Sequence, residues 1–196
     1  MKKYPDLIFV LKIILIFIFI VWVILWRFNK RLDNYMGFID PEEYFAKNIP
    51  PELLSSLPPD PGKAGKTTIE GIDSDKDGIR DDVFRSITFV APTSYNKREA
   101  MKQLAKAFQA HILSKTEEEA KKTDIFMEKS WECLFKLEEL KLLEQGYAFL
   151  ETTSIVKSIV VNTKQRRNAY DNAQRLMGTV FEYSFKEPCE FTIVYQ

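Results

Sequence analysis

The stretch NKREAMKQLAKAFQAHIL, residues 96–113, decides the fold. It opens with Asn96 and Glu99 in the spacing of a capping box, in which two side chains satisfy free backbone amides at a helix start. Apolar residues then recur three or four positions apart. They are Met101, Leu104, Ala105, Phe108 and Ile112. This period predicts an amphipathic helix with one face in a core.

The same pattern is found in the next segment. Thr116 and Glu119 repeat the capping-box spacing at the start of a second helix, and Gly146 suits its end. The apolar face expected for this helix comprises Phe126, Cys133, Leu137 and Leu140, with Met127, Trp131 and Leu134 beside it. The two patterns together predict neighbouring helices that share a core.

Further helical patterns cover residues 82–90, 147–161 and 163–177, and Gly178 suits the end of the last. The basic run TKQRR, residues 163–167, is most simply a solvated helix start. The tail that follows alternates aromatic and β-branched residues, which allows one short C-terminal β-hairpin. The sequence therefore predicts a mainly α fold, a small bundle of four or five helices.

An apolar run near the start of the chain predicts a transmembrane helix. Residues 7–26 are 20 residues with a single charge, Lys12. At about 1.5 Å per residue such a helix spans roughly 30 Å, the hydrocarbon thickness of a bilayer. Trp22 and Trp26 suit the membrane interface. No small-residue cleavage site follows in residues 27–36, so we expect an uncleaved signal anchor with the lipid bilayer as its partner.

Basic residues flank both ends of this run, so the positive-inside rule does not decide its orientation. A short N-terminal tail usually stays inside in bacterial signal anchors, which favours a single-pass inner-membrane protein with a periplasmic C-terminal domain. Cys133 and Cys189 fit an exported domain, because an even number of cysteines there suggests a disulfide. Two reduced, buried thiols are the alternative.

The segment GIDSDKDGIRDD, residues 71–82, places five aspartates in twelve positions although the chain has no net charge. Ca²⁺ takes six to eight oxygen ligands, which alternate residues of a loop can supply. The expected ligands are Asp73, Asp75, Asp77, the backbone carbonyl of Ile79, Asp81 and Asp82. Gly78 stands where the chain must bend sharply. A solvated acidic turn is the alternative.

This motif resembles the D-x-D-x-D-G calcium loop of EF-hand proteins, although Phe84 stands where that loop carries a bidentate glutamate. The form D-x-D-x-D-G-x-x-D looks more like the loops of thrombospondin type 3 and dockerin-like repeats, where a nearby aspartate supplies the closing ligand. The wider run PPDPGKAGKTTIEGIDSDKDGIRDDV, residues 58–83, is similar to a stretch of uncharacterised membrane-anchored bacterial envelope proteins. These resemblances imply a calcium site and a cellular context, without an activity.

Four segments are expected along the chain. They are a signal anchor (1–31), a proline-rich spacer (32–70), a calcium-binding loop (71–85) and a helical domain (86–196). The spacer either leads from the bilayer to the folded domain or wraps over it. No amphipathic helix precedes Asp73, which favours a structural ion over a calcium switch.

Other chemistry finds little support in the sequence. His111, the sole histidine, borders an apolar stripe and is expected to be partly buried and hydrogen-bonded. The run GKAGKTT, residues 62–68, lacks the first glycine of a phosphate-binding loop, so no nucleotide is expected. The balanced charge gives no reason to expect nucleic acid.

The sequence thus favours a non-catalytic, membrane-anchored calcium-binding protein with a structural or interaction role in the cell envelope, where another envelope protein could be its partner. Two other functions stay open. One is an envelope hydrolase with a site that the sequence does not reveal. The other is a calcium-responsive protein that faces the cytosol.

Overall fold

The computed structural model describes residues 19, 21–23, 49–143, 148–178 and 183–195. The chain divides into two compact units, Met1–Lys47 and Asn48–Gln196. The predicted signal anchor, residues 1–31 with the apolar run 7–26, lies mostly outside the described residues. Among the described residues, no helix combines the length and the hydropathy needed to cross a bilayer.

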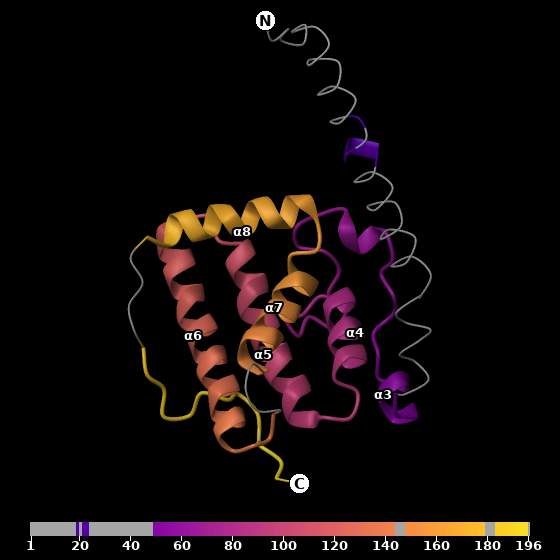
Figure 1. Cartoon of the computed structure of the whole chain (residues 1–196), viewed down its shortest axis with the longest axis vertical. Helices are drawn as coiled ribbons and strands as arrows, with labels where there is room; N and C mark the ends of the chain where they lie inside the picture. Colours follow the sequence, from indigo (N-terminus) through magenta and orange to yellow (C-terminus); the bar gives the residue numbers. More distant parts are fainter. Residues whose placement is uncertain (1–18, 20, 24–48, 144–147, 179–182, 196) are drawn as a thin grey trace, which may run out of the picture. The chain divides into compact units, whose positions relative to one another are not determined.

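Helices provide all the regular structure of the described residues, which contain no strand (Figure 1). Two short helices come first, α3 (Pro51–Ser55) and the 3-10 helix η1 (Ala64–Lys66). The longer helices are α4 (Asp81–Val90), α5 (Tyr95–Ile112), α6 (Glu117–Glu139), α7 (Ala148–Val160) and α8 (Lys164–Met177). The predicted mainly α fold is confirmed.

Helix α5 forms the centre of the bundle. It packs against α4, α6, α7 and α8, and α8 crosses the ends of α5 and α6 (Figure 1). The stripe predicted on α5 is buried, with exposed fractions of 3% or less for Met101, Leu104, Ala105, Phe108 and Ile112. Burial of each large apolar side chain contributes roughly 1.5–3 kcal/mol, so this stripe is a main source of stability.

The start of α5 differs from the expectation. Ser94, not Asn96, is the N-cap, and its side chain accepts a hydrogen bond from the Lys97 amide. Asn96 instead bonds the C-terminal segment: its amide donates to the Val194 carbonyl (2.6 Å), and its oxygen accepts from the Val194 amide (3.0 Å). The capping role moves two residues back because Asn96 holds a distant part of the chain.

Helix α6 begins as predicted and ends earlier. Thr116 and Glu119 form both bonds of the capping box. The helix ends at Glu139, and Lys141 adopts a left-handed conformation with φ 58°. The Leu142 amide then donates to the Leu137 carbonyl (2.9 Å), the bond of a Schellman motif. Gly146, the predicted end of this helix, lies outside the described residues.

The buried face of α6 is also rotated from the expected one. Met127, Cys133, Leu134 and Leu137 are at most 1% exposed. Phe126 and Leu140, which we placed on the buried face, are 43% and 39% exposed. The face that packs includes the small residue Ser130, which apolar periodicity alone does not identify.

The described part of the C-terminal tail, residues 183–195, forms no strand, so the hairpin that the sequence allowed is not seen there. Side-chain amides of α5 take the place of a partner strand. Besides the Asn96 pair, Gln103 donates to the Pro188 carbonyl (2.8 Å) and accepts from the Glu190 amide (2.9 Å). These bonds satisfy the extended backbone without a second strand.

Cys133 and Cys189 are joined by a disulfide with a Cα–Cα distance of 4.8 Å. It links the buried face of α6 to the same tail segment that Gln103 holds. The tail is therefore attached to both central helices.

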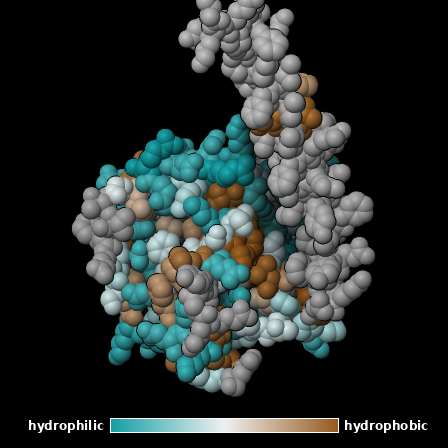
Figure 2. All heavy atoms as spheres, viewed as in Figure 1, coloured by the Kyte–Doolittle hydropathy of each residue, from teal (hydrophilic) through white to brown (hydrophobic). Residues whose placement is uncertain are grey.

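On the face seen in Figure 2, hydrophilic atoms follow α8 along the upper edge, and hydrophobic atoms gather lower, in the middle of the helical unit.

Candidate metal site

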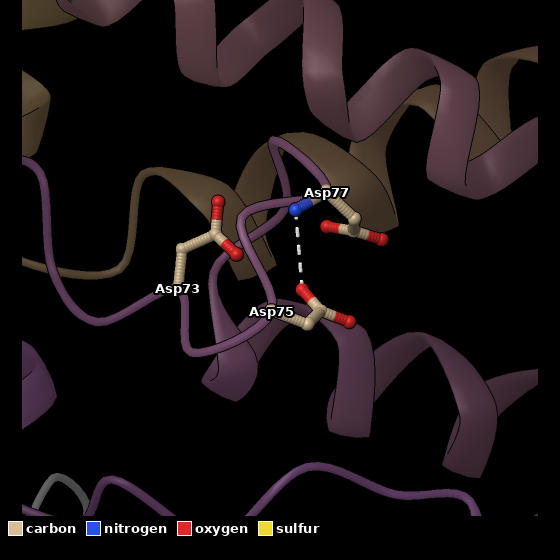
Figure 3. A group of neighbouring side chains, drawn as sticks. All are labelled: Asp73, Asp75 and Asp77. Carbon is tan, nitrogen blue, oxygen red and sulfur yellow. Dashed lines mark hydrogen bonds between the residues drawn. The ribbon is translucent and has the colours of Figure 1, made fainter.

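The structure brings three of the predicted ligands together. One carboxylate oxygen from each of Asp73, Asp75 and Asp77 lies within 4.8 Å of the other two at one turn of the loop (Figure 3). Closely spaced carboxylates repel one another unless a cation lies between them. Their oxygens are hard donors, so this group could hold a hard metal ion.

Each of these carboxylates also accepts a hydrogen bond from an amide of its own loop. Asp73 accepts from Gly78 (3.0 Å), Asp75 from Asp77 (3.1 Å; Figure 3), and Asp77 from Ile79 (2.7 Å). One oxygen of each side chain is thereby fixed. The second oxygen of Asp73, Oδ1, is buried and has no hydrogen-bond partner among the described residues. The loop therefore orients the carboxylates and leaves one oxygen of each for an ion.

Two residues with positive φ give this loop its shape, Lys76 (φ 59°) and Gly78 (φ 89°). A Cβ added at Gly78 would come no closer than 3.9 Å to the Lys106 side chain, so space does not require glycine there. The backbone conformation does, because a side chain is strained at this φ. The sequence indicated the bend at Gly78 and gave no signal for the one at Lys76.

The loop is docked on the helical bundle by its last residues. The Ile79 side chain, 2% exposed, lies in the core cluster. The side-chain amide of Gln109 on α5 accepts from the Arg80 amide (3.2 Å) and donates to the Gly78 carbonyl (3.3 Å). The position of the loop is therefore set by α5.

Asp81 is placed outside the carboxylate group. Its side chain is turned toward Ser74 and accepts from the Ser74 amide (3.0 Å) and from the Ser74 hydroxyl (2.6 Å). The residue is 2% exposed and opens α4. In this arrangement both carboxylate oxygens of Asp81 close the base of the loop.

Asp82 is the counter-ion of two buried arginines, Arg80 and Arg166. Its carboxylate lies 2.9 Å from the Arg80 Nε and 3.7 Å from an Arg166 guanidinium nitrogen. Asn162 donates a further hydrogen bond to it (2.9 Å). The structure thus gathers Asp73, Asp75 and Asp77, and gives Asp81 and Asp82 other partners.

Arg166 is a buried residue beside the site that the sequence did not indicate. We expected its segment to be a solvated helix start, and Thr163 does cap α8, but Arg166 is fully buried. Its guanidinium donates to three backbone carbonyls of the preceding segment: Gly65 (2.6 Å), Thr68 (3.0 Å) and Ile69 (3.1 Å). The end of the proline-rich segment is therefore bonded to α8.

Gly71 is the residue that this packing requires to be a glycine. A Cβ added at Gly71 would meet the side chains of Arg80 and Arg166, and its φ of 69° also disfavours any other residue. Nothing in the local composition distinguishes Arg166 from the exposed Arg167 beside it. The signal is instead the glycine in a distant loop, which cannot be paired with Arg166 from one sequence.

The charges of the loop and of the arginines alter their ionisation. The pKa of Asp77 is raised, first by partial burial and then by the negative charges of Asp75 and Asp73. The hydrogen bond from the Ile79 amide and the positive charge of Lys106 oppose this rise. The pKa of Arg166 is lowered by burial and by the neighbouring charge of Arg80, and Asp82 opposes this. In the absence of a cation, the loop therefore favours the protonated form of Asp77 more than free aspartate does.

His111 lies in the core and offers no free ring nitrogen. It is fully buried rather than partly buried, with Nδ1 2.9 Å from the Thr123 hydroxyl and Nε2 3.1 Å from the Gln174 amide nitrogen. Burial lowers the pKa of His111 to about 4. A neutral histidine with both nitrogens engaged is a structural residue.

Comparison of the chain with family models, curated proteins and solved structures finds no match. The metal site is therefore argued from the loop itself. What the loop presents is a group of three aspartates held by hydrogen bonds and docked on α5.

Proposed function

We propose that this chain is a single-pass, membrane-anchored calcium-binding protein whose exported helical domain has a structural or interaction role in the cell envelope. The observation that carries the proposal is the group of Asp73, Asp75 and Asp77, which bring one carboxylate oxygen each to within 4.8 Å of one another. The amides of the loop orient them, and no charged side chain of opposite sign forms a salt bridge with them among the described residues.

Calcium suits this loop better than magnesium does. Ca²⁺ accepts many protein oxygens in flexible geometry, whereas Mg²⁺ keeps several of its waters and uses one or two carboxylates. The ion would be structural, because Ile79 and Gln109 fix the end of the loop to the core. It would join the segment before the loop to the first long helix, α4.

The disulfide supports an exported domain. A bond such as Cys133–Cys189 persists in oxidising compartments and is rare in the cytosol. The apolar run 7–26 supplies the proposed anchor. A weak extracellular type of affinity, roughly 10⁻⁴ to 10⁻³ M, would suffice outside the cytoplasm. The same disulfide disfavours a calcium-responsive protein that faces the cytosol.

The test is thermal unfolding of the full chain in lipid nanodiscs as Ca²⁺ is increased to millimolar concentration. The wild type should gain roughly 1 kcal/mol, seen as a rise in Tm of a few degrees. Asp75→Ala combined with Asp77→Ala should abolish this rise. A double variant that still responds like the wild type would show that the ion binds elsewhere.

A matched control removes two carboxylates outside the loop. Glu118 and Asp171 are exposed, on α6 and α8. The double variant Glu118→Ala with Asp171→Ala changes the net charge by the same amount and should keep the Ca²⁺-dependent rise. Mg²⁺ at equal concentration should give a smaller rise than Ca²⁺.

A further inference from the structure

A hollow of about 690 Å³ lies between the aspartate loop, α5 and α6. Its volume falls in the range of pockets that bind small organic molecules, roughly 300–1,000 Å³. Ala107 and Ala110 of α5 line it, together with two apolar side chains that the bundle leaves partly open, Leu113 (36% exposed) and Phe126 (43% exposed). Asp73 is shared between the hollow and the metal site.

The hollow has cations at its edge. Lys76 and Lys106 both border it. Neither forms a salt bridge with a described residue, although the charge of Lys106 acts on the Asp77 carboxylate. Three acids also line the hollow, Glu70, Asp73 and Glu190, and of these Glu190 is already paired with Lys129 (3.0 Å). With a divalent ion bound, the three aspartates keep one net negative charge, so an anion would be held by direct bonding to the ion and by Lys76 and Lys106, not by a general excess of positive charge.

The proposed ion has room for a further ligand. The structure gathers three aspartates, and the Ile79 carbonyl expected from the sequence would add a fourth ligand, whereas calcium takes six to eight oxygens. Asp81 and Asp82, the acids that follow in the loop, are bonded to Ser74 and to the arginines. The remaining positions are open to water or to oxygens of a molecule in the hollow.

We propose that this hollow binds an organic carboxylate with an apolar body. The carboxylate would complete the calcium shell and face Lys106, and the body would lie over Ala110, Leu113 and Phe126. This inference rests on the proposed calcium site. A neutral molecule of the same shape would gain the apolar contacts alone, and a cation would meet Lys106 and the metal ion.

The test uses 3-phenylpropionate as the probe and the uncharged 3-phenylpropionamide as its matched control. Full-length chain in nanodiscs, labelled at alanine and leucine methyl groups, is titrated by NMR in saturating Ca²⁺ and again in excess chelator. The acid should move the Ala110 and Leu113 signals saturably. Its apparent affinity should be about tenfold higher with Ca²⁺ than without, and about tenfold higher than that of the amide.

Two variants test the apolar contacts and the Lys106 contact separately. Ala110→Phe fills the hollow and leaves the three aspartates unchanged, so it should remove probe binding, read from the Leu113 signal, and keep Ca²⁺ binding. Lys106→Gln should weaken the acid and leave the amide unchanged. Unchanged binding of the acid by the Ala110→Phe variant would overturn the proposal.

A Ca²⁺ titration without probe distinguishes this inference from the proposed function. If Ca²⁺ binds and the acid does not, or if acid and amide bind alike, the hollow is no carboxylate site and the metal site stands. If no Ca²⁺ binds, both proposals fail together. If the acid binds equally in chelator, the ion has no part in it and the inference is wrong.

Discussion

Arg166 shows how one side chain can connect parts of the chain that are far apart in sequence. Its guanidinium bonds carbonyls about 100 residues earlier, at Gly65 and Thr68, while it lies near the carboxylate of Asp82. Buried charges destabilise a protein unless they are paired and fully hydrogen-bonded, and Arg166 meets this condition through backbone carbonyls as much as through an acid. The rigid fork of a guanidinium suits this task, and an ammonium group does not.

Replacement of Arg166 by alanine should therefore destabilise the fold by roughly 3–5 kcal/mol, because it leaves buried carbonyls and Asp82 without partners. Arg167→Ala, one residue on and exposed, should change the free energy of unfolding by less than about 0.5 kcal/mol. Urea unfolding of the two variants measures the difference. Equal, small effects would show that the buried network does not stabilise the native state.

His111 makes the stability depend on pH. Its pKa is about 4 in the folded chain and near 6.5 when unfolded, so the unfolded state binds a proton first as the pH falls. The free energy of unfolding should therefore decrease from about pH 6.5 down to about pH 4, by roughly 3 kcal/mol in total. Protonation would also place a second N–H opposite the Gln174 amide, which must then rotate to present its oxygen.

The measurement compares the wild type with His111→Gln by urea unfolding at several pH values. The difference in unfolding free energy between the two chains should change across that interval and stay constant above it. The pKa of the buried Asp124 is raised by burial, and this residue titrates in both chains, so its contribution cancels in the difference. A difference that is flat from pH 7 to pH 4 would contradict a buried, neutral histidine.

At the scale of elements, the ends of helices show what the sequence could and could not predict. Capping motifs and apolar stripes predicted the helices correctly where local sequence decides the structure, as at Thr116 on α6 and along α5. These local patterns gave the wrong role to side chains that form hydrogen bonds with a distant segment. Asn96 looks like a cap and instead holds Val194, and Arg166 looks solvated and instead holds the carbonyls before the loop.

The residues of the candidate metal site also fall into those that the local sequence could place and those that only the fold places. The alternation of Asp73, Asp75 and Asp77 is a local property, so the sequence could place them together. The roles of Asp81 and Asp82 depend on Ser74 and on arginines that only the fold brings near. The sequence motif alone does not distinguish an aspartate that binds a metal ion from one that pairs with an arginine.

The end of α6 offers a prediction at this scale. Lys141 adopts φ 58°, a left-handed conformation that costs a residue with a Cβ about 1 kcal/mol and costs glycine little. Lys141→Gly should therefore raise the free energy of unfolding by up to about 1 kcal/mol. Glu139→Gly, in the last helical residue and also exposed, should lower it by a similar amount. Thermal unfolding of the pair checks the opposite signs, and two destabilised variants would contradict the Schellman ending.

At the scale of the whole molecule, Asn48–Gln196 forms a compact unit in which the helices do not stand alone. The segment before the loop is bonded to α8 by Arg166, and the C-terminal tail is bonded to α5 by amides and to α6 by the disulfide. Both flanking segments therefore add to the stability of the bundle. The aspartate loop lies between the first of these segments and α4, where an ion would join the two.

The most direct measurement is the amount of calcium bound by the full-length chain, determined by equilibrium dialysis against radioactive Ca²⁺ at millimolar free concentration. The wild type should hold one ion per chain. The variant with Asp75→Ala and Asp77→Ala should hold none. A wild-type chain that retains no calcium under these conditions would contradict the account, and the aspartate loop would then be a solvated turn.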